Sequence, residues 1–194
     1  MAIFICSDWH LWHRKILIYE NRPFQDLNSM HKTIFDNINK TLTSKDDILI
    51  NCGDICCGTW GTDVWPHTIY DFLTSLNGRM VLIRGNHDTD IRCEIYKECG
   101  VEVFDYLSFP KEKVLFTHQY NTRKNLRGIN MSCENWNYMP FPLEEMLKYG
   151  KKDWLNICGH SHSRWRTREP KVNNMKTNNS PSVKGVMSNG GGSN

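Results

Sequence analysis

The stretch MVLIRGNHDTD, residues 80–90, begins as an apolar run and ends in Gly-Asn-His-Asp. A short apolar run that is bounded by glycine and polar residues is typical of a buried strand. Here the strand would end by placing an amide, an imidazole and a carboxylate side by side. Such a triplet could belong to a ligand site or could simply be a capped turn, and the other apolar runs of the chain help to decide.

Four other apolar runs also end in aspartate or histidine. They are residues 3–6 before Ser7-Asp8-Trp9-His10, residues 48–50 before Gly53-Asp54, residues 114–116 before His118, and residues 155–158 before Gly159-His160-Ser161-His162. Each motif alone is more often a turn than a ligand pair. Because ligands gather at the carboxyl ends of strands in open α/β sheets, five such ends in one chain predict a single polar cleft.

Helical patterns alternate with these strands. Residues 27–42 carry apolar side chains at spacings of three or four, and residues 65–76 repeat the pattern, which predicts two amphipathic helices. Alternation of strands and helices indicates an α/β layered fold. From about Lys171 the composition shifts to Asn, Ser, Gly and Lys, so we expect a folded domain over residues 1–170 and a flexible polar tail over residues 171–194.

Composition limits the class of protein. The chain has 194 residues, 39% hydrophobic and 23% charged, which is typical of one soluble domain. A formal net charge of +3 is too small for a dedicated nucleic-acid binder, so no stable nucleic-acid complex is expected. No apolar run approaches the roughly 18 residues that span a membrane. A cytoplasmic location is expected, in the host cytoplasm if a phage encodes the chain.

The candidate ligands are nitrogen and oxygen donors. Five of the eight histidines lie in the five strand endings. Imidazoles combined with carboxylates suit Mn²⁺, Fe, Ni²⁺ or Zn²⁺. The eight cysteines form no paired C-x-x-C pattern, which favours reduced thiols in the core. Gly53, Gly85 and Gly159 are expected to give the backbone room to turn beside the cluster.

In this order, the motifs Asp-x-His, Gly-Asp, Gly-Asn-His-Asp, a single His and Gly-His-x-His resemble those of the calcineurin-like metallophosphoesterases. The resemblance spans residues 3–162, and residues 7–24 are similar to the small bacterial and phage members. It implies a four-layer α-β-β-α sandwich of two mixed β-sheets. It also implies two divalent ions per chain, with Mn²⁺ expected first.

The resemblance assigns a role to each motif residue. One ion would be bound by Asp8, His10 and His162, and the other by Asn86, His118 and His160. Asp54 would bridge the two ions, His87 would face the leaving group, and Asp88 would orient His87. The implied reaction is in-line attack on a phosphate ester by a metal-bridging hydroxide.

The expected substrate is a small or nucleotide-type phosphodiester. A phosphomonoesterase and a catalytically silent module that binds a phosphate-bearing partner remain as alternatives. Arg22, Arg164 and Arg166 are candidates for substrate binding, although a solvated strand edge would also explain the last two. Trp9 and Trp12 could stack on a base or pack in the core.

Overall fold

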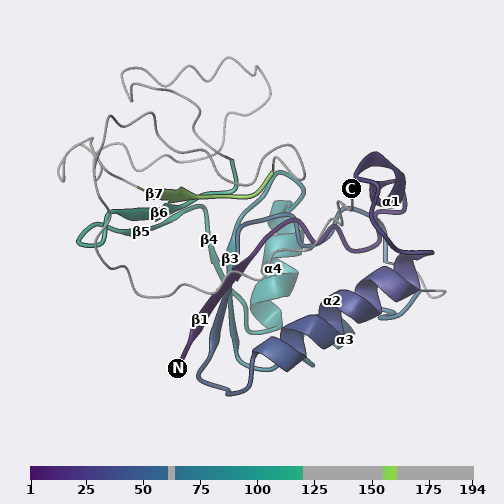
Figure 1. Cartoon of the computed structure of the whole chain (residues 1–194), viewed down its shortest axis with the longest axis horizontal. Helices are drawn as coiled ribbons and strands as arrows, with labels where there is room; N and C mark the ends of the chain where they lie inside the picture. Colours follow the sequence, from purple (N-terminus) through teal and green to yellow (C-terminus); the bar gives the residue numbers. More distant parts are fainter. Residues whose placement is uncertain (61–63, 120–154, 161–194) are drawn as a thin grey trace, which may run out of the picture.

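The computed structural model describes residues 1–60, 64–119 and 155–160, which form two sheets (Figure 1). The first is a parallel sheet with strand order β1-β2-β3-β4, made of β1 (Ile3–Cys6), β2 (Ile48–Asn51), β3 (Arg79–Ile83) and β4 (Glu102–Phe104). The second has the order β5-β6-β7, made of β5 (Leu107–Phe109), β6 (Val114–Phe116) and β7 (Leu155–Ile157). It is mixed, because β6 pairs antiparallel with β5 and parallel with β7.

All five strands predicted from the sequence are confirmed to within a residue or two at each end. Their register brings the predicted motifs together, since Cys6 pairs with Asn51 and Asn51 with Leu82 at the carboxyl ends of β1, β2 and β3. In the second sheet the Gly159 N–H donates to the His118 carbonyl at 2.9 Å, which aligns the segments after β6 and β7.

Helices connect the strands of the first sheet. They are α1 (Ile16–Tyr19), α2 (Leu27–Thr41), α3 (Ile69–Leu73) and α4 (Asp90–Glu98). Since a crossover helix returns the chain to the same end of the sheet, neighbouring strands run parallel. This explains why the first sheet is parallel in its described strands, whereas a mixed sheet was expected.

The two predicted helices differ in how closely they match. The prediction of α2 is confirmed, and its start is fixed by a capping box in which the Asp26 side chain accepts from the Ser29 N–H. Helix α3 is shorter than the predicted 65–76 stretch. The Thr68 side chain accepts from the Asp71 N–H and begins the helix there, so Trp65 precedes it.

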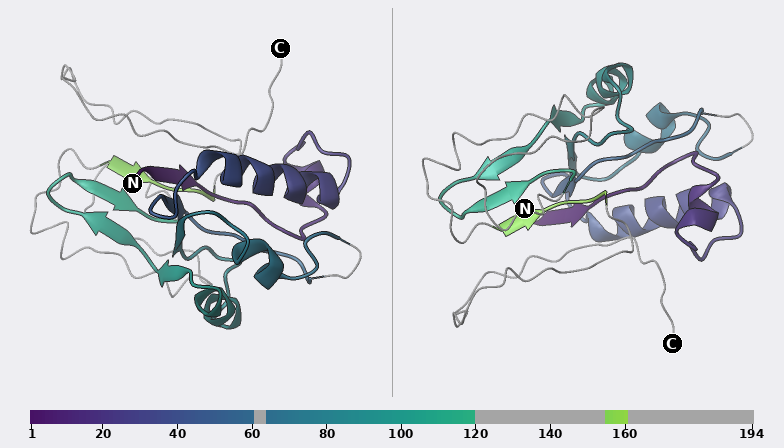
Figure 2. Two further views of the ribbon diagram at one scale, coloured as in Figure 1. Left: turned by 90° about the horizontal axis from the view of Figure 1, so that it is seen from below. Right: turned by 90° about the horizontal axis from the view of Figure 1, so that it is seen from above.

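The first sheet lies between two apolar cores. Successive side chains of a strand point to opposite faces. Leu49 and Leu82 therefore pack toward the helices, whereas Ile50 and Ile83 pack toward Phe116 of the second sheet. The described elements thus form three layers: helices, the parallel sheet and the mixed sheet (Figure 2). A helical layer on the other face of the second sheet would come from outside the described residues and stays a prediction.

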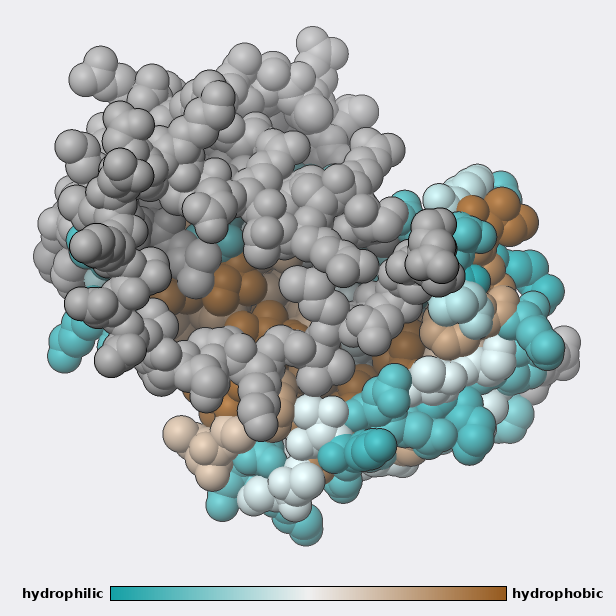
Figure 3. Space-filling view, viewed as in Figure 1, coloured by the Kyte–Doolittle hydropathy of each residue, from teal (hydrophilic) through white to brown (hydrophobic). Residues whose placement is uncertain are grey.

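The outer surface of the helical layer is mostly hydrophilic, while hydrophobic residues lie along its side toward the sheets (Figure 3). This distribution follows from the amphipathic pattern of α2, whose Met30, Ile34 and Ile38 are buried. Within the part of the chain that the structure describes, every helix is too short or too polar to cross a membrane.

Candidate metal centre

Asp54 lies at the middle of a buried cluster. Its Oδ2 atom is 3.6 Å from His10 Nε2 and 3.3 Å from His118 Nε2. All three side chains are almost fully buried. One carboxylate oxygen therefore faces two imidazole nitrogens that come from different strand ends.

Asn86 joins the cluster from the loop after β3. Its Oδ1 lies 2.9 Å from His118 Nε2 and 3.0 Å from His160 Nδ1, and these two imidazole nitrogens are 3.2 Å apart. His118 Nδ1 lies 2.7 Å from the Cys52 carbonyl, so this nitrogen carries the hydrogen. A histidine that donates through one nitrogen to a carbonyl presents the other as a metal ligand.

Asp8 joins the loop after β1 to the loop after β7. Its Oδ1 lies 3.7 Å from His10 Nε2, and its two carboxylate oxygens accept the His160 N–H at 3.1 and 3.0 Å. Two groups whose ligand atoms lie within 4.8 Å of one another result: Asp8, His10 and Asp54, and Asp54, His118 and His160. Asp54 belongs to both groups.

The backbone of this cluster is unusual. Asp8, His10, Asp54 and His160 have φ angles of 57°, 52°, 59° and 63°. Residues other than glycine seldom adopt positive φ, and such strain concentrates at functional sites. All four residues follow a strand by only two to four positions, so the turns direct their side chains toward the common centre.

Two glycines leave the space that the cluster needs. A Cβ at Gly53, whose φ is 104°, would lie 2.8 Å from the His118 ring carbon Cγ. A Cβ at Gly85 would lie 2.9 Å from the Asp54 carboxyl carbon. Both distances are too short for real contacts, so the expectation that these glycines make room is confirmed.

The electrostatics of the cluster favour a bound cation. Burial raises the pKa of Asp54, but the hydrogen bond and charge of His118 outweigh it and lower this pKa to about 2. Burial likewise lowers the pKa of His118, yet Asp54 raises it to about 9. The pocket thus draws positive charge toward the Asp54 carboxylate, and the donor set of carboxylates, imidazoles and an amide fits divalent ions.

His87 lies beside this cluster. Its backbone N–H donates to Asp54 Oδ1 at 2.8 Å, and its ring centroid is 5.3 Å from that of His10. Its Nδ1 is 3.3 Å from the sulfur of Cys57. Burial lowers the pKa of His87. The half-buried imidazole is therefore adjacent to the ligands but outside the two groups that contain Asp54.

Asp88 makes different contacts from those expected. It accepts from the backbone N–H groups of Asp54 and Gly85 at 2.8 and 2.9 Å, and from that of Ile55 at 3.2 Å. Burial raises the pKa of Asp88. Its hydrogen bonds go to the loops after β2 and β3 and to Tyr96, not to the His87 ring. Asp88 therefore positions the loops that carry the ligands.

Two arginines also hold the loops that carry the ligands: Arg22 holds the loop after β1, and Arg92 holds the loops after β2 and β3. Arg22 donates to the carbonyl oxygens of Asp8 and Trp9 at 2.6 and 2.8 Å. Arg92 donates to those of Cys56, His87 and Gly58 at 2.8, 2.8 and 2.9 Å. The substrate contact expected for Arg22 stays a prediction.

Sequence reasoning missed Arg92 and Cys57. Arg92 resembles any other charged residue of an amphipathic helix, and Cys57 lacks a paired spacing. Only the fold brings them next to His87.

Trp9 and Trp12 are buried in the core, so they pack there and do not stack on a base. Cys6, Cys52, Cys56 and Cys93 are buried free thiols, as predicted.

Six of the seven predicted metal ligands lie in the described residues, and all six converge. The seventh, His162, lies outside them, as do Arg164, Arg166 and the predicted tail over residues 171–194.

The sequence pattern of the calcineurin-like phosphoesterase family matches residues 1–185. The chain belongs to this family. It is 37% identical over 168 residues to the uncharacterized protein MJ1445 of Methanocaldococcus jannaschii, covering 77% of this chain and 92% of the other. A crystal structure of a protein of unknown function from Aquifex aeolicus, AQ665, is similar with a TM-score of 0.56 and 25% identity, over 87% of this chain and 82% of that one. The family's metal-dependent hydrolysis of phosphate esters agrees with this cluster of candidate metal ligands.

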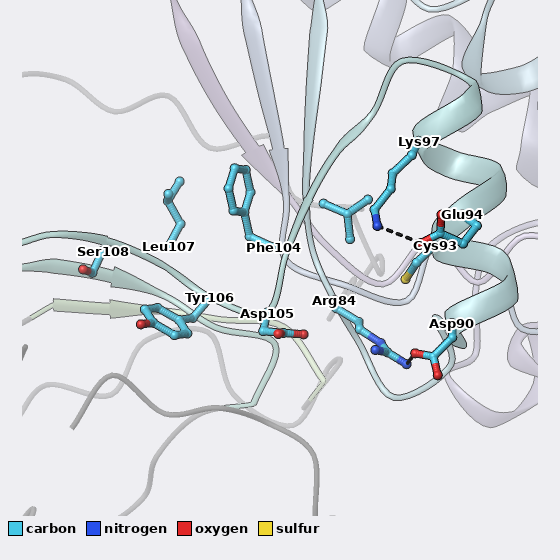
Figure 4. A pocket seen from close by; sticks show the side chains of 11 residues that line it. Arg84, Asp90, Cys93, Glu94, Lys97, Phe104, Asp105, Tyr106, Leu107 and Ser108 are labelled. Atoms are coloured by element: carbon cyan, nitrogen blue, oxygen red, sulfur yellow. Dashed lines mark hydrogen bonds and ion pairs between the residues drawn. The ribbon is translucent and has the colours of Figure 1, made fainter. Parts of the chain in front are cut away.

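A separate cleft of about 650 Å³ lies between α4, β4 and β5 (Figure 4). Four of its charged side chains form two pairs, since Arg84 lies 2.6 Å from Asp90 and Lys97 lies 2.8 Å from Glu94, and Asp105 adds a further negative charge to the lining. The cleft therefore offers little uncompensated charge to an anionic ligand, and it contains none of the predicted metal ligands.

Proposed function

We propose that this phosphoesterase uses two divalent ions, with Mn²⁺ as the expected metal, to hydrolyse a small or nucleotide-type phosphodiester. The observation that carries the proposal is the position of Asp54, whose carboxylate belongs to both groups of candidate ligands. Two ions about 3.5 to 4 Å apart need such a shared anion. Asp8, His10 and His162 would complete one ion site, and Asn86, His118 and His160 the other.

The residues of the chain have separable tasks. Bound ions would supply an activated water and neutralise the phosphoryl oxygens. The Asp54 carboxylate holds the two halves of the site at a fixed spacing, and the His118 Nδ1–H···O=C bond keeps Nε2 turned toward the centre. His87 would donate a proton to the leaving oxygen, a contribution of about 10² to 10⁴ in rate.

The use of the nearby arginines favours a diester over a monoester. A monoester brings close to two negative charges and is commonly held by cationic side chains in the site. Among the described residues, the guanidinium groups of Arg22 and Arg92 donate to backbone carbonyls behind the cluster. A diester carries one charge and a poor leaving group, for which an acid such as His87 matters most.

The test compares kcat/KM for bis-nitrophenyl phosphate, nitrophenyl phosphate, cyclic nucleotides and a labelled oligonucleotide at one Mn²⁺ concentration. We expect the diesters to be hydrolysed best, and activity to disappear in chelator. A monoester preference above about tenfold would favour the phosphomonoesterase alternative. Absence of turnover on every ester, with metal bound, would favour the silent binding module.

A further inference from the structure

A thiol lies against the proposed catalytic histidine. Cys57 follows Asp54 by three residues, and its half-buried Sγ is 3.3 Å from His87 Nδ1. Donor atoms of Cys57, His87 and His10 all lie within 4.8 Å of one another. A further imidazole, that of His13, packs with its centroid 5.4 Å from the His10 ring and 6.3 Å from the His87 ring.

The distance between Cys57 Sγ and His87 Nδ1 is close to that between two ligand atoms of a tetrahedral metal site. In such a site sulfur lies about 2.3 Å and nitrogen about 2.0 Å from Zn²⁺, which places the two ligand atoms about 3.5 Å apart. The observed separation of 3.3 Å between Cys57 Sγ and His87 Nδ1 needs only a small adjustment. Thiolate with imidazole is a soft donor set, which suits Zn²⁺, Cd²⁺ or Co²⁺ far better than Mg²⁺ or Mn²⁺.

We propose that Cys57, His87 and His10 form a binding site for a thiophilic divalent ion such as Zn²⁺, adjoining the catalytic centre and sharing His10 with it. Binding releases the thiol proton to solvent and forms a sulfur–metal bond. The ion would occupy His87 and draw His10 away from Asp8 and Asp54. This site would therefore act as an inhibitory switch that responds to soft metals, a regulatory role that rests on the proposed function.

The fixed geometry of the loops supports this assignment. Arg92 binds the carbonyl oxygens of Cys56 and Gly58 on one loop and of His87 on the other. The same guanidinium thus holds His87 and the two residues on either side of Cys57. Because the backbone of both loops is already fixed, little ordering entropy opposes binding.

Cobalt spectroscopy tests the site without any substrate. Metal-free protein titrated with Co²⁺ alone should develop a thiolate-to-cobalt charge-transfer band, which nitrogen and oxygen ligands do not give. Cys57→Ser should lose the band and weaken Cd²⁺ binding at least tenfold. Cys99→Ser removes another half-buried thiol and should keep both. A wild-type protein without the band, or a Cys57→Ser variant that retains it, would overturn the proposal and leave only an S–H···N hydrogen bond.

A second measurement needs no variant. Maleimide labelling of the folded protein, mapped by peptide mass spectrometry, should slow at Cys57 at least tenfold with Zn²⁺ and hardly change with Mg²⁺. Equal labelling rates in both ions would refute the site.

Inhibition of hydrolysis tests the regulatory role. Zn²⁺ should inhibit Mn²⁺-supported hydrolysis at a concentration at least tenfold lower in wild type than in Cys57→Ser, and equal sensitivity of the two proteins would refute this role. Because the band and the labelling require no turnover, their outcome is independent of whether the proposed hydrolysis is found.

Discussion

Replacement of Arg22 by methionine should separate a supporting role from a substrate contact. The guanidinium is largely buried, and burial lowers the pKa of Arg22. It donates to the carbonyl oxygens of Asp8 and Trp9 at 2.6 and 2.8 Å. A hydrogen bond from a charged group contributes about 1.5 to 3 kcal/mol, and because the two bonds share one side chain we expect a combined loss of about 2 to 4 kcal/mol.

For a chain of this length, 1 kcal/mol corresponds to about 2 to 4 °C in Tm, so Arg22→Met should melt about 4 to 16 °C lower. Because Asp8 stands at positive φ, its loss of backbone support should also weaken metal binding and lower kcat. Urea unfolding, metal titration and steady-state kinetics measure these effects. Arg79→Met is the control, since it removes only an exposed pair with Glu102, worth about 1 kcal/mol or less. If Arg22→Met had unchanged stability and kcat but a raised KM, this reasoning would be refuted and Arg22 would instead be assigned to substrate binding.

Three further predictions follow from the same contacts. Asp54→Ala should lower the bound Mn²⁺ from about two ions per chain to fewer than one and abolish hydrolysis, measured by elemental analysis; full activity with one ion per chain would contradict the bridging role. His87→Ala should keep its metal and lose about 10²-fold or more in kcat, and a metal-free variant would instead make His87 a ligand. Burial lowers the pKa of His31 to about 4, while the ring accepts from the Trp12 N–H and bonds the Trp65 carbonyl. The unfolded chain thus binds a proton more readily, and stability present above about pH 6.5 should fall by about 2 to 3 kcal/mol by pH 4.5; urea unfolding of His31→Gln should show a correspondingly smaller fall.

The strands could be predicted from the sequence because each is a short apolar run that ends in glycine or polar residues. The run 80–83 became β3 with one added residue, Arg79, which pairs with Ile48 in the ladder. By contrast, none of the three residues of β4 or of β5 is fully buried. Their short mixed patterns carry no clear period, so the sequence did not distinguish them from loops.

The ligands could be predicted because metal chemistry restricts the residue types and because strand ends share one edge of a sheet. The residues that hold them could not. The family resemblance implied that Asp88 would orient His87. Its carboxylate instead bonds backbone N–H groups 33 and 34 positions away, at Ile55 and Asp54. A pattern of side chains does not reveal which distant backbone groups need a partner.

The charged side chains around this site each bond backbone groups of the opposite polarity. The Asp88 carboxylate accepts from the backbone N–H groups of Asp54 and Gly85. Arg22 and Arg92 donate to backbone carbonyl oxygens, among them those of Asp8 and His87. Asp88 is buried and the two arginines are half-buried, so all three need partners, and the turns with positive φ carry backbone groups that need partners as well. The two needs satisfy each other. As a result, the side chains of Asp54, His118 and Asn86 remain directed at the centre, where a divalent ion can replace the proton that His118 otherwise holds.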